Sequence, residues 1–173
     1  SVAFTFTGCT GTPDMVIGEG LKNANVTLTG AKAVLKYYRR GNNIVESKGE
    51  KYMNAFEIAS GKTWTFNDGF EIKKTEGQTV TLTNNGTLNV TASTSAMLQD
   101  ALTAGANQVN LEATTYELAS HLLIAKPVSI EGTITDKDST KIKPASNWSG
   151  SDNGSKNLVR IDASNTSLKN LLV

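Results

Sequence analysis

Few residues of this chain carry side chains suited to catalysis, and they lie far apart in the sequence. His121 is the only histidine and Cys9 the only cysteine. A histidine base needs a nucleophile within hydrogen-bonding reach, but Cys9 belongs to a different predicted domain. We therefore expect His121 to be a surface or turn residue and Cys9 to be a small buried or edge-strand residue. A lone cysteine also excludes an intrachain disulfide and a zinc site built on several thiolates.

Acidic residues do not form a recognisable catalytic pair or metal-binding motif. Asp136 and Asp138 flank Lys137 and would supply two carboxylates to calcium, which takes about six to eight oxygen ligands. We expect a solvated loop there, with calcium binding as the alternative. Glycoside hydrolysis needs two carboxyl groups across a cleft. The sequence gives no reason to choose two among Glu46, Glu50, Glu57, Glu71 and Glu76. No catalytic residue, metal or cofactor is predicted.

Aromatic residues are the better candidates for binding a ligand, because flat rings can stack on the apolar faces of sugars. The sequence predicts a carbohydrate site that draws on Trp148, Tyr38, Arg39 and Trp64. Trp148 lies in a loop rich in Ser, Asn and Gly, and among these aromatic residues it is the one that we most expect to be exposed. Tyr38 follows Tyr37 on a predicted strand, so the two side chains point to opposite faces and one belongs to the core. Trp64 alternates with two threonines, and we expect it in the core as well.

Composition favours a β-rich fold and excludes several classes of partner. The 173 residues carry a net charge of +1, which gives no electrostatic basis for binding nucleic acid or an anionic membrane. Thr, Asn and Ser make up 52 of the residues, a balance typical of threonine-rich strands joined by Asn and Ser turns. No apolar run approaches the roughly 20 residues of a membrane-spanning helix.

The first half of the chain has the pattern of successive short strands. Apolar and polar residues alternate with a period of two, as in strands with one buried face. The strands are predicted at residues 2–7, 25–29, 33–40, 43–47, 55–59, 63–66, 70–73, 79–83 and 87–91. The last two flank Asn84-Asn85-Gly86, and an Asn-Gly pair is typical of a tight hairpin turn. We therefore predict a small antiparallel β-sandwich or meander, with this hairpin as its clearest element.

A different pattern begins near Ser93. Thr94-Ser95 is suited to cap a short helix, and Gly105 lies just beyond its expected end. The residues expected on the buried face of this helix are Leu98, Ala101 and Leu102. Short strands follow with no hairpin dipeptides between most of them, so we expect stacked coils with parallel pairing. They are predicted at residues 108–111, 116–118, 122–124, 128–130, 140–143, 158–161 and 168–173.

Several short motifs follow one another in this second half. They are MLQDAL at 97–102, VNL at 109–111, YEL at 116–118, LLIAKPVSIEG at 122–132 and SLKNL at 167–171. Their order and spacing resemble the opening of pectin-lyase-like right-handed β-helix proteins, in which a short amphipathic helix caps the first coil. Residues 113–115 (Ala-Thr-Thr) precede Tyr116 where that family has a glycine.

The resemblance implies the capped start of a right-handed parallel β-helix. In lyase and hydrolase members of the family, catalytic Arg, Lys or Asp residues lie on middle coils of a long helix. Those coils are not present here, so no catalytic residue carries over, although the parent protein could be a polysaccharide lyase or glycoside hydrolase. We expect the chain to be the N-terminal part of a longer protein, whose uncovered last coil favours self-association through Leu168, Leu171 and Val173.

The sequence as a whole predicts an all-β protein in two parts. Residues 1–93 form the antiparallel domain, and residues 94–173 form the N-terminal cap and first coils of a right-handed β-helix. The predicted role is that of a bacterial extracellular or cell-surface protein engaged with polysaccharide, with no catalytic centre in this part. The alternative is a structural or adhesive module without glycan specificity, because a fold alone does not establish a function.

Overall fold

Short β-strands are the main regular secondary structure of the described chain. The computed structural model describes residues 1–36, 55–73, 80–135, 139–148 and 157–173. Within these ranges the chain divides into two compact units, Ser1–Asn89 and Val90–Val173. The all-β class predicted from the sequence is confirmed. The domain boundary that the sequence places after residue 93 stays a prediction.

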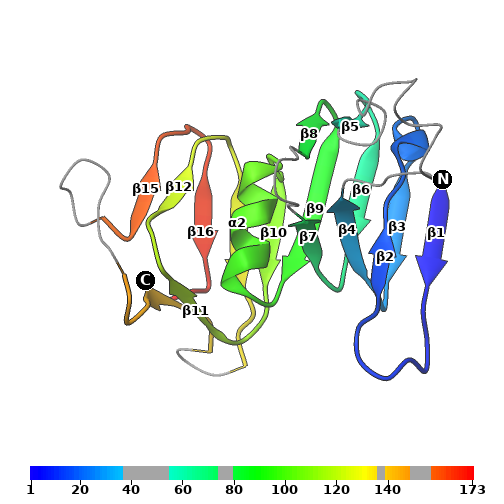
Figure 1. Ribbon diagram of the computed structural model, residues 1–173. Helices are drawn as coiled ribbons and strands as arrows, with labels where there is room; N and C mark the ends of the chain where they lie inside the picture. The colour runs from blue at the N-terminus through cyan, green and yellow to red at the C-terminus, as the bar shows by residue number, and fades with distance from the viewer. Residues whose placement is uncertain (37–54, 74–79, 136–138, 149–156) are drawn as a thin grey trace, which may run out of the picture. The chain divides into compact units, whose positions relative to one another are not determined.

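The first unit contains three sheets. Strands that are neighbours in a sheet are separated along the chain by strands of the other sheets (Figure 1). The main sheet has the order β1 (Val2–Thr5), β3 (Val26–Thr29), β6 (Thr63–Phe66) and β9 (Thr87–Ala92), the last of which runs into the second unit. A second sheet has the order β2 (Asp14–Val16), β4 (Lys32–Lys36) and β7 (Phe70–Lys73), and a third pairs β5 (Ala55–Ile58) with β8 (Thr81–Asn84). A single turn of 3-10 helix, η1 (Glu19–Leu21), precedes β3.

The second unit repeats this arrangement after one α-helix, α2 (Ser95–Thr103). Its main sheet continues from β9 through β10 (Gln108–Leu111), β13 (Ser129–Gly132) and β16 (Ser167–Lys169). The two smaller sheets pair β11 (Thr115–Leu118) with β14 (Lys141–Pro144), and β12 (Leu122–Ile124) with β15 (Val159–Ile161). The helix packs against β10, β11 and β12.

Paired strands run parallel, and the partners lie far apart in the sequence. Ser129 pairs with Ser167, 38 residues further along, and Val26 pairs with Trp64 in the same way. Parallel strands cannot be joined by a tight turn and need a crossover of a dozen or more residues. Here the crossover contains the strands of the other sheets. The predicted antiparallel sandwich or meander for residues 1–93 is therefore wrong, because the strands of this region pair in parallel.

The predicted Asn-Gly hairpin is wrong for the same reason. Strand β8 pairs with β5, whereas β9 belongs to the main sheet, so the turn between them is a corner joining two sheets. The corner stacks on the preceding stretch of chain, since the amide of Asn85 donates to the carbonyl of Ile58 at 3.0 Å and that of Thr87 donates to Lys62 at 2.9 Å. A Cβ on Gly86 would overlap the carbonyl oxygen of Lys62. Glycine is needed here because the stacked corners approach each other closely. The resulting Asn-Gly pair cannot be told from that of a hairpin turn by sequence alone.

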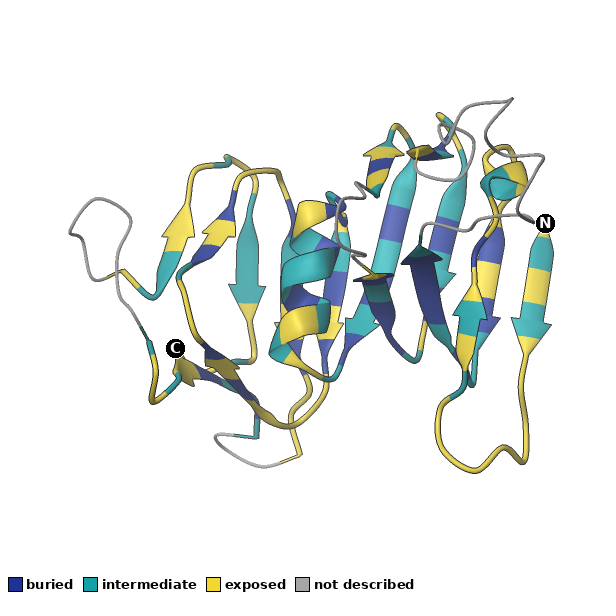
Figure 2. Cartoon of the chain, viewed as in Figure 1, coloured by how far each residue is buried: buried dark blue, intermediate teal, exposed yellow. Residues whose placement is uncertain are grey.

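The core is formed by rows of apolar side chains that stack from strand to strand. Alternate residues are buried in inner strands such as β6 and β9 (Figure 2). The register places Leu28 on Phe66 in the first unit and Val109 on Ile130 in the second, and all four are fully buried. Burying such a side chain contributes roughly 1.5–3 kcal/mol. Within the main sheet, the apolar row of each inner strand is therefore covered by the row of the next paired strand.

The turn between β10 and β11 is held by a buried tyrosine. The hydroxyl of Tyr116 donates to the carbonyl of Ala92 at 2.6 Å and lies 3.2 Å from the carbonyl of Glu112. The amide of Glu112 also donates to Ala92, and the amide of Thr114 donates to Glu112. These bonds fix the turn without a glycine before the tyrosine. Burial raises the pKa of Tyr116 to about 12.

Replacing Gly132 tests the close approach of stacked strands. A Cβ there would overlap the carbonyl oxygen of Asn170, so Gly132→Ala should cost about 1–3 kcal/mol of stability and lower the melting temperature. Gly20→Ala is the matched control, since a Cβ at Gly20 meets nothing within 4 Å and should change stability by no more than about 0.5 kcal/mol. Equal melting temperatures for the two variants would contradict the stacking.

The buried hydroxyl of Tyr116 predicts a loss of stability at alkaline pH. An unfolded tyrosine ionises near pH 10, whereas Tyr116 in the folded chain keeps its proton to about pH 12. Below about pH 10 the tyrosine is protonated in both the folded and the unfolded state. Between about pH 10 and 12 only the unfolded state ionises, so about 2–3 kcal/mol of the free energy of unfolding is lost over this range. Tyr116→Phe should start less stable at pH 8, yet lose less stability over that range. Parallel pH profiles for the two proteins in chemical denaturation would contradict this assignment.

Candidate functional site

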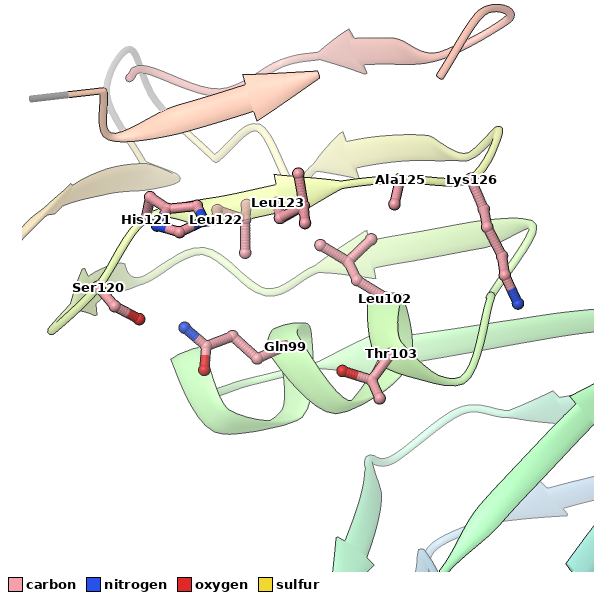
Figure 3. Close-up of a pocket in the computed structure, with 9 residues that line it drawn as sticks. All are labelled: Gln99, Leu102, Thr103, Ser120, His121, Leu122, Leu123, Ala125 and Lys126. Atoms are coloured by element: carbon pink, nitrogen blue, oxygen red, sulfur yellow. The ribbon is translucent and has the colours of Figure 1, made fainter. Parts of the chain in front are cut away.

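A groove in the second unit lies between helix α2 and the segment around β12 (Figure 3). Its volume is about 320 Å³, at the lower end of the range for small-molecule pockets. The helix contributes Gln99, Leu102 and Thr103, and the other wall is formed by Ser120, His121, Leu122, Leu123, Ala125 and Lys126. We call this the α2–β12 groove.

Helix α2 is positioned by its cap, as the sequence predicts, and by its buried face. Leu102 was predicted on that face, but it is half-buried and borders the groove. The Thr94 hydroxyl accepts a hydrogen bond from the amide of Met97 at 3.2 Å, and Leu98 and Ala101 are buried. Gly105 follows the helix with a φ of +73°, which a glycine adopts without strain. The buried face anchors the helix, so Gln99 and Thr103 lie on the side that borders the groove (Figure 3).

The opposite wall follows from the alternation of β12. Leu122 and Ile124 are buried, whereas Leu123 is 42% exposed. Pairing with β15 holds this strand, and the amide of Leu122 also donates to the carbonyl of Leu158 at 2.9 Å. Leu102 and Leu123 thus form an apolar middle section of the groove, between His121 with Ser120 at one end and Lys126 at the other (Figure 3).

The polar side chains of the groove do not bond to other residues of the described chain. Within the described ranges, no hydrogen bond or ion pair is found for the side chains of Gln99, Thr103, Ser120, His121 and Lys126. The lining residues include no carboxylate. A Cβ on Gly105 would lie 3.0 Å from Lys126 Nζ, which places this ammonium beside the end of α2. The groove therefore presents free hydrogen-bonding groups and one unpaired cation.

Ser120 and His121 are the groove residues whose side chains are of the types used in nucleophilic catalysis. A serine nucleophile is activated by a hydrogen bond to a base, which is in turn oriented by a third group. The contacts among described residues include no hydrogen bond between Ser120 and His121 and none that would orient the imidazole. His121 is half-buried at the groove, so its predicted position as a surface or turn residue agrees with the structure.

A second feature is the outward face of the main sheet in the first unit. The outward positions of β1, β3, β6 and the first half of β9 carry no charged residue; they are Ala3, Thr5, Thr27, Thr29, Thr63, Thr65, Thr87 and Asn89. We call this the Thr/Asn face. The register aligns Thr5 with Thr29 and Thr27 with Thr65.

Hydrogen bonds order the Thr/Asn face across its strands. The side-chain amide of Asn67 donates to the Thr29 hydroxyl at 2.9 Å, and the side-chain amide of Asn89 donates to the Thr65 hydroxyl at 3.5 Å. Neighbouring strands lie about 4.8 Å apart and residues on one side repeat every ~6.6 Å along a strand. The result is a regular array of hydroxyl and methyl groups.

The other sheets of the first unit carry their charges outward. Lys32 Nζ lies 2.6 Å from Glu71 and 3.1 Å from Asp14, and the hydrogen bond to Glu71 is the main cause that raises the pKa of Lys32. On the β5–β8 sheet, Glu57 pairs with Lys22 at 2.6 Å, and this contact lowers the pKa of Glu57. The absence of charge from the Thr/Asn face is therefore specific to that face among the described sheets of this unit.

The four residues predicted to bind carbohydrate do not form a common site in the described structure. Trp64 is fully buried, and its indole N–H lies 3.3 Å from the carbonyl of Ala24. It cannot stack on a sugar, so Trp64 lies in the core as expected, and the prediction that it binds carbohydrate is wrong. Trp148 lies in the other unit and is half-buried, with an indole nitrogen that has no partner in the described chain. Tyr38 and Arg39 lie outside the described residues.

The remaining predicted positions give no further site. Asp136 and Asp138 lie outside the described residues, and no cluster of three His, Cys, Asp or Glu side chains suited to a metal is found within the described ranges. Cys9 is exposed, not buried. Leu168 and Leu171 are half-buried and Val173 is 59% exposed, and self-association through these three residues stays a prediction.

Comparison with protein-family models, with curated proteins and with solved structures found no match to this chain. None of the described helices has the length and apolar character required to span a membrane. The geometry of the groove and of the Thr/Asn face is therefore the basis for any functional assignment.

Sequence reasoning considered His121 but missed the groove around it. Gln99 and Thr103 lie on α2 and Lys126 follows β12, and only the packing of α2 on β12 brings them together. The Leu122-Leu123-Ile124 run is the one sequence feature that indicates an apolar surface here. In a strand whose first and third residues are buried, the middle leucine must face away from the core.

Proposed function

We propose that this chain is a right-handed parallel β-helix module that binds neutral polysaccharide outside the cell or at its surface. The parallel pairing of strands 18 or more residues apart supports the helix, since crossovers between parallel strands are right-handed in about 98% of cases. The amphipathic helix α2 ahead of β10–β12 and the motifs at residues 97–132 and 167–171 support the same fold.

The observation that carries the proposed ligand class is the uncharged Thr/Asn face. Each threonine presents a hydroxyl that both donates and accepts, together with a methyl group. A sugar ring likewise presents hydroxyls and apolar C–H groups. Because the face carries no charge, a neutral ligand that displaces its water leaves no buried charge unpaired. An unpaired buried charge would cost several kcal/mol. A neutral polysaccharide chain therefore suits this face better than an acidic or basic polymer.

The regular spacing of the face suits a ligand that is itself periodic. Thr5 and Thr29 lie in one row across the strands and Thr27 and Thr65 in the next. A polymer contacts many such positions at once, and the weak contacts of single residues then add through a high effective concentration. No aromatic platform is required for binding of this kind.

The second candidate is a structural or adhesive module without glycan specificity. It is favoured by the hydrogen bonds of Asn67 to Thr29 and of Asn89 to Thr65, because they already use part of the bonding capacity of the face. On this account the face stabilises the stacked strands and binds no polysaccharide.

Charge placed on the Thr/Asn face should separate the two candidates. Thr27→Lys with Thr65→Lys should weaken binding to a neutral polysaccharide about tenfold, a loss of about 1.4 kcal/mol, because desolvating two ammonium groups opposes binding. Co-sedimentation of the full chain with cellulose, chitin and β-1,3-glucan particles measures this binding.

Thr83→Lys is the matched control for these substitutions. Thr83 is an exposed strand threonine of the same unit, but it lies on the β5–β8 sheet. Its replacement should leave polysaccharide binding unchanged. Absence of binding to all three polysaccharides would favour the structural module, and equal weakening by Thr83→Lys would contradict a site on the Thr/Asn face.

A further inference from the structure

The α2–β12 groove has two chemically different ends separated by an apolar middle section (Figure 3). Lys126 lies at one end, whereas Gln99, Ser120 and His121 gather at the other. Between them the side chain of Leu102 faces the strand that carries Leu123. A ligand that fills this groove must therefore be elongated and must differ in polarity between its ends.

The charge of the groove selects the group that binds at the Lys126 end. A helix C-terminus carries a partial charge of about −0.5, which only partly offsets the full positive charge of the neighbouring ammonium. No carboxylate is among the lining residues, and Lys126 has no ion-pair partner within the described ranges. The end beside Lys126 therefore attracts an anion. A carboxylate there would form a charge-assisted hydrogen bond.

The apolar middle section and the far end complete the specificity. Leu102, Leu123 and Ala125 offer methyl and methylene groups to an aliphatic chain, whose burial is worth roughly 25 cal/mol per Å². The amide of Gln99 and the hydroxyl of Ser120 can donate and accept hydrogen bonds. A terminal hydroxyl group on the ligand would bond with them.

We propose that the α2–β12 groove binds a short aliphatic carboxylate that carries a hydroxyl group at its far end. The carboxylate contacts Lys126, the chain lies over Leu102 and Leu123, and the hydroxyl lies near Gln99, Ser120 and His121. This site is separate from the Thr/Asn face and does not depend on polysaccharide binding.

Three probes of equal length test the order of affinities that this arrangement requires. They are 6-hydroxyhexanoate, 1,6-hexanediol and 6-amino-1-hexanol, which share six carbons and a terminal hydroxyl and carry a carboxylate, a hydroxyl or an ammonium group at the other end. In NMR titrations of the full chain, 6-hydroxyhexanoate should bind about tenfold more tightly than the diol, and the amine should bind most weakly. Shifts should concentrate on the signals of Leu102, Leu123 and Ala125.

Substitutions then assign the preference to particular residues. Lys126→Met should reduce the affinity for 6-hydroxyhexanoate to that for the diol, whereas Lys169→Met, on the exposed end of β16, should not. Leu123→Ser should weaken the binding of 6-hydroxyhexanoate and of 1,6-hexanediol by the same factor. The proposal is overturned if the carboxylate binds no more tightly than the diol, if Lys126→Met keeps the preference, or if no probe shifts the groove signals.

Discussion

The hydrogen-bonded ladder between parallel strands is the interaction on which the rest of this structure depends. Each strand satisfies its backbone groups against a strand that the chain reaches only after crossing the other sheets. The same step places apolar side chains on one another, as with Leu28 and Phe66, so the ladder and the core form together. The ladder also fixes where side chains cannot fit. Gly86 and Gly132 each face a carbonyl oxygen of a stacked neighbour, and a Cβ at either position would displace it.

Both candidate binding surfaces are consequences of this ladder. The Thr/Asn face exists because the residues between the buried ones must point outward and are brought into rows by the register. The α2–β12 groove exists because α2 packs against strands of the second unit while Leu123 alternates with two buried neighbours. Tyr116 supports the same region by bonding to Ala92 and so tying β11 to the end of β9. The surfaces differ in chemistry, one uncharged and periodic, the other short, with a cation at one end.

The sequence predicted the elements well and their pairing poorly. Strands β6, β7, β10 and β12 have the predicted bounds, and Thr94 caps α2 as expected, because alternation and capping are local properties. Alternation reports which face of a strand is buried but does not identify its partner. The Asn85-Gly86 corner therefore has the local sequence of a hairpin turn, although its two strands do not pair. The buried position of Trp64 followed from its threonine neighbours, whereas the groove depends on contacts between α2 and β12 that no local pattern encodes.

Backbone nuclear Overhauser effects in the isotopically labelled chain test the parallel ladder most directly. Parallel pairing predicts cross-strand contacts of Leu28 with the region of Phe66, and of Ile130 with the region of Leu168. Contacts from the strand of Thr81–Asn84 should lead to Ala55–Ile58, not to the adjacent strand of Thr87–Ala92. An antiparallel set of close Hα–Hα contacts between Thr81–Asn84 and Thr87–Ala92 would contradict the ladder and restore the hairpin.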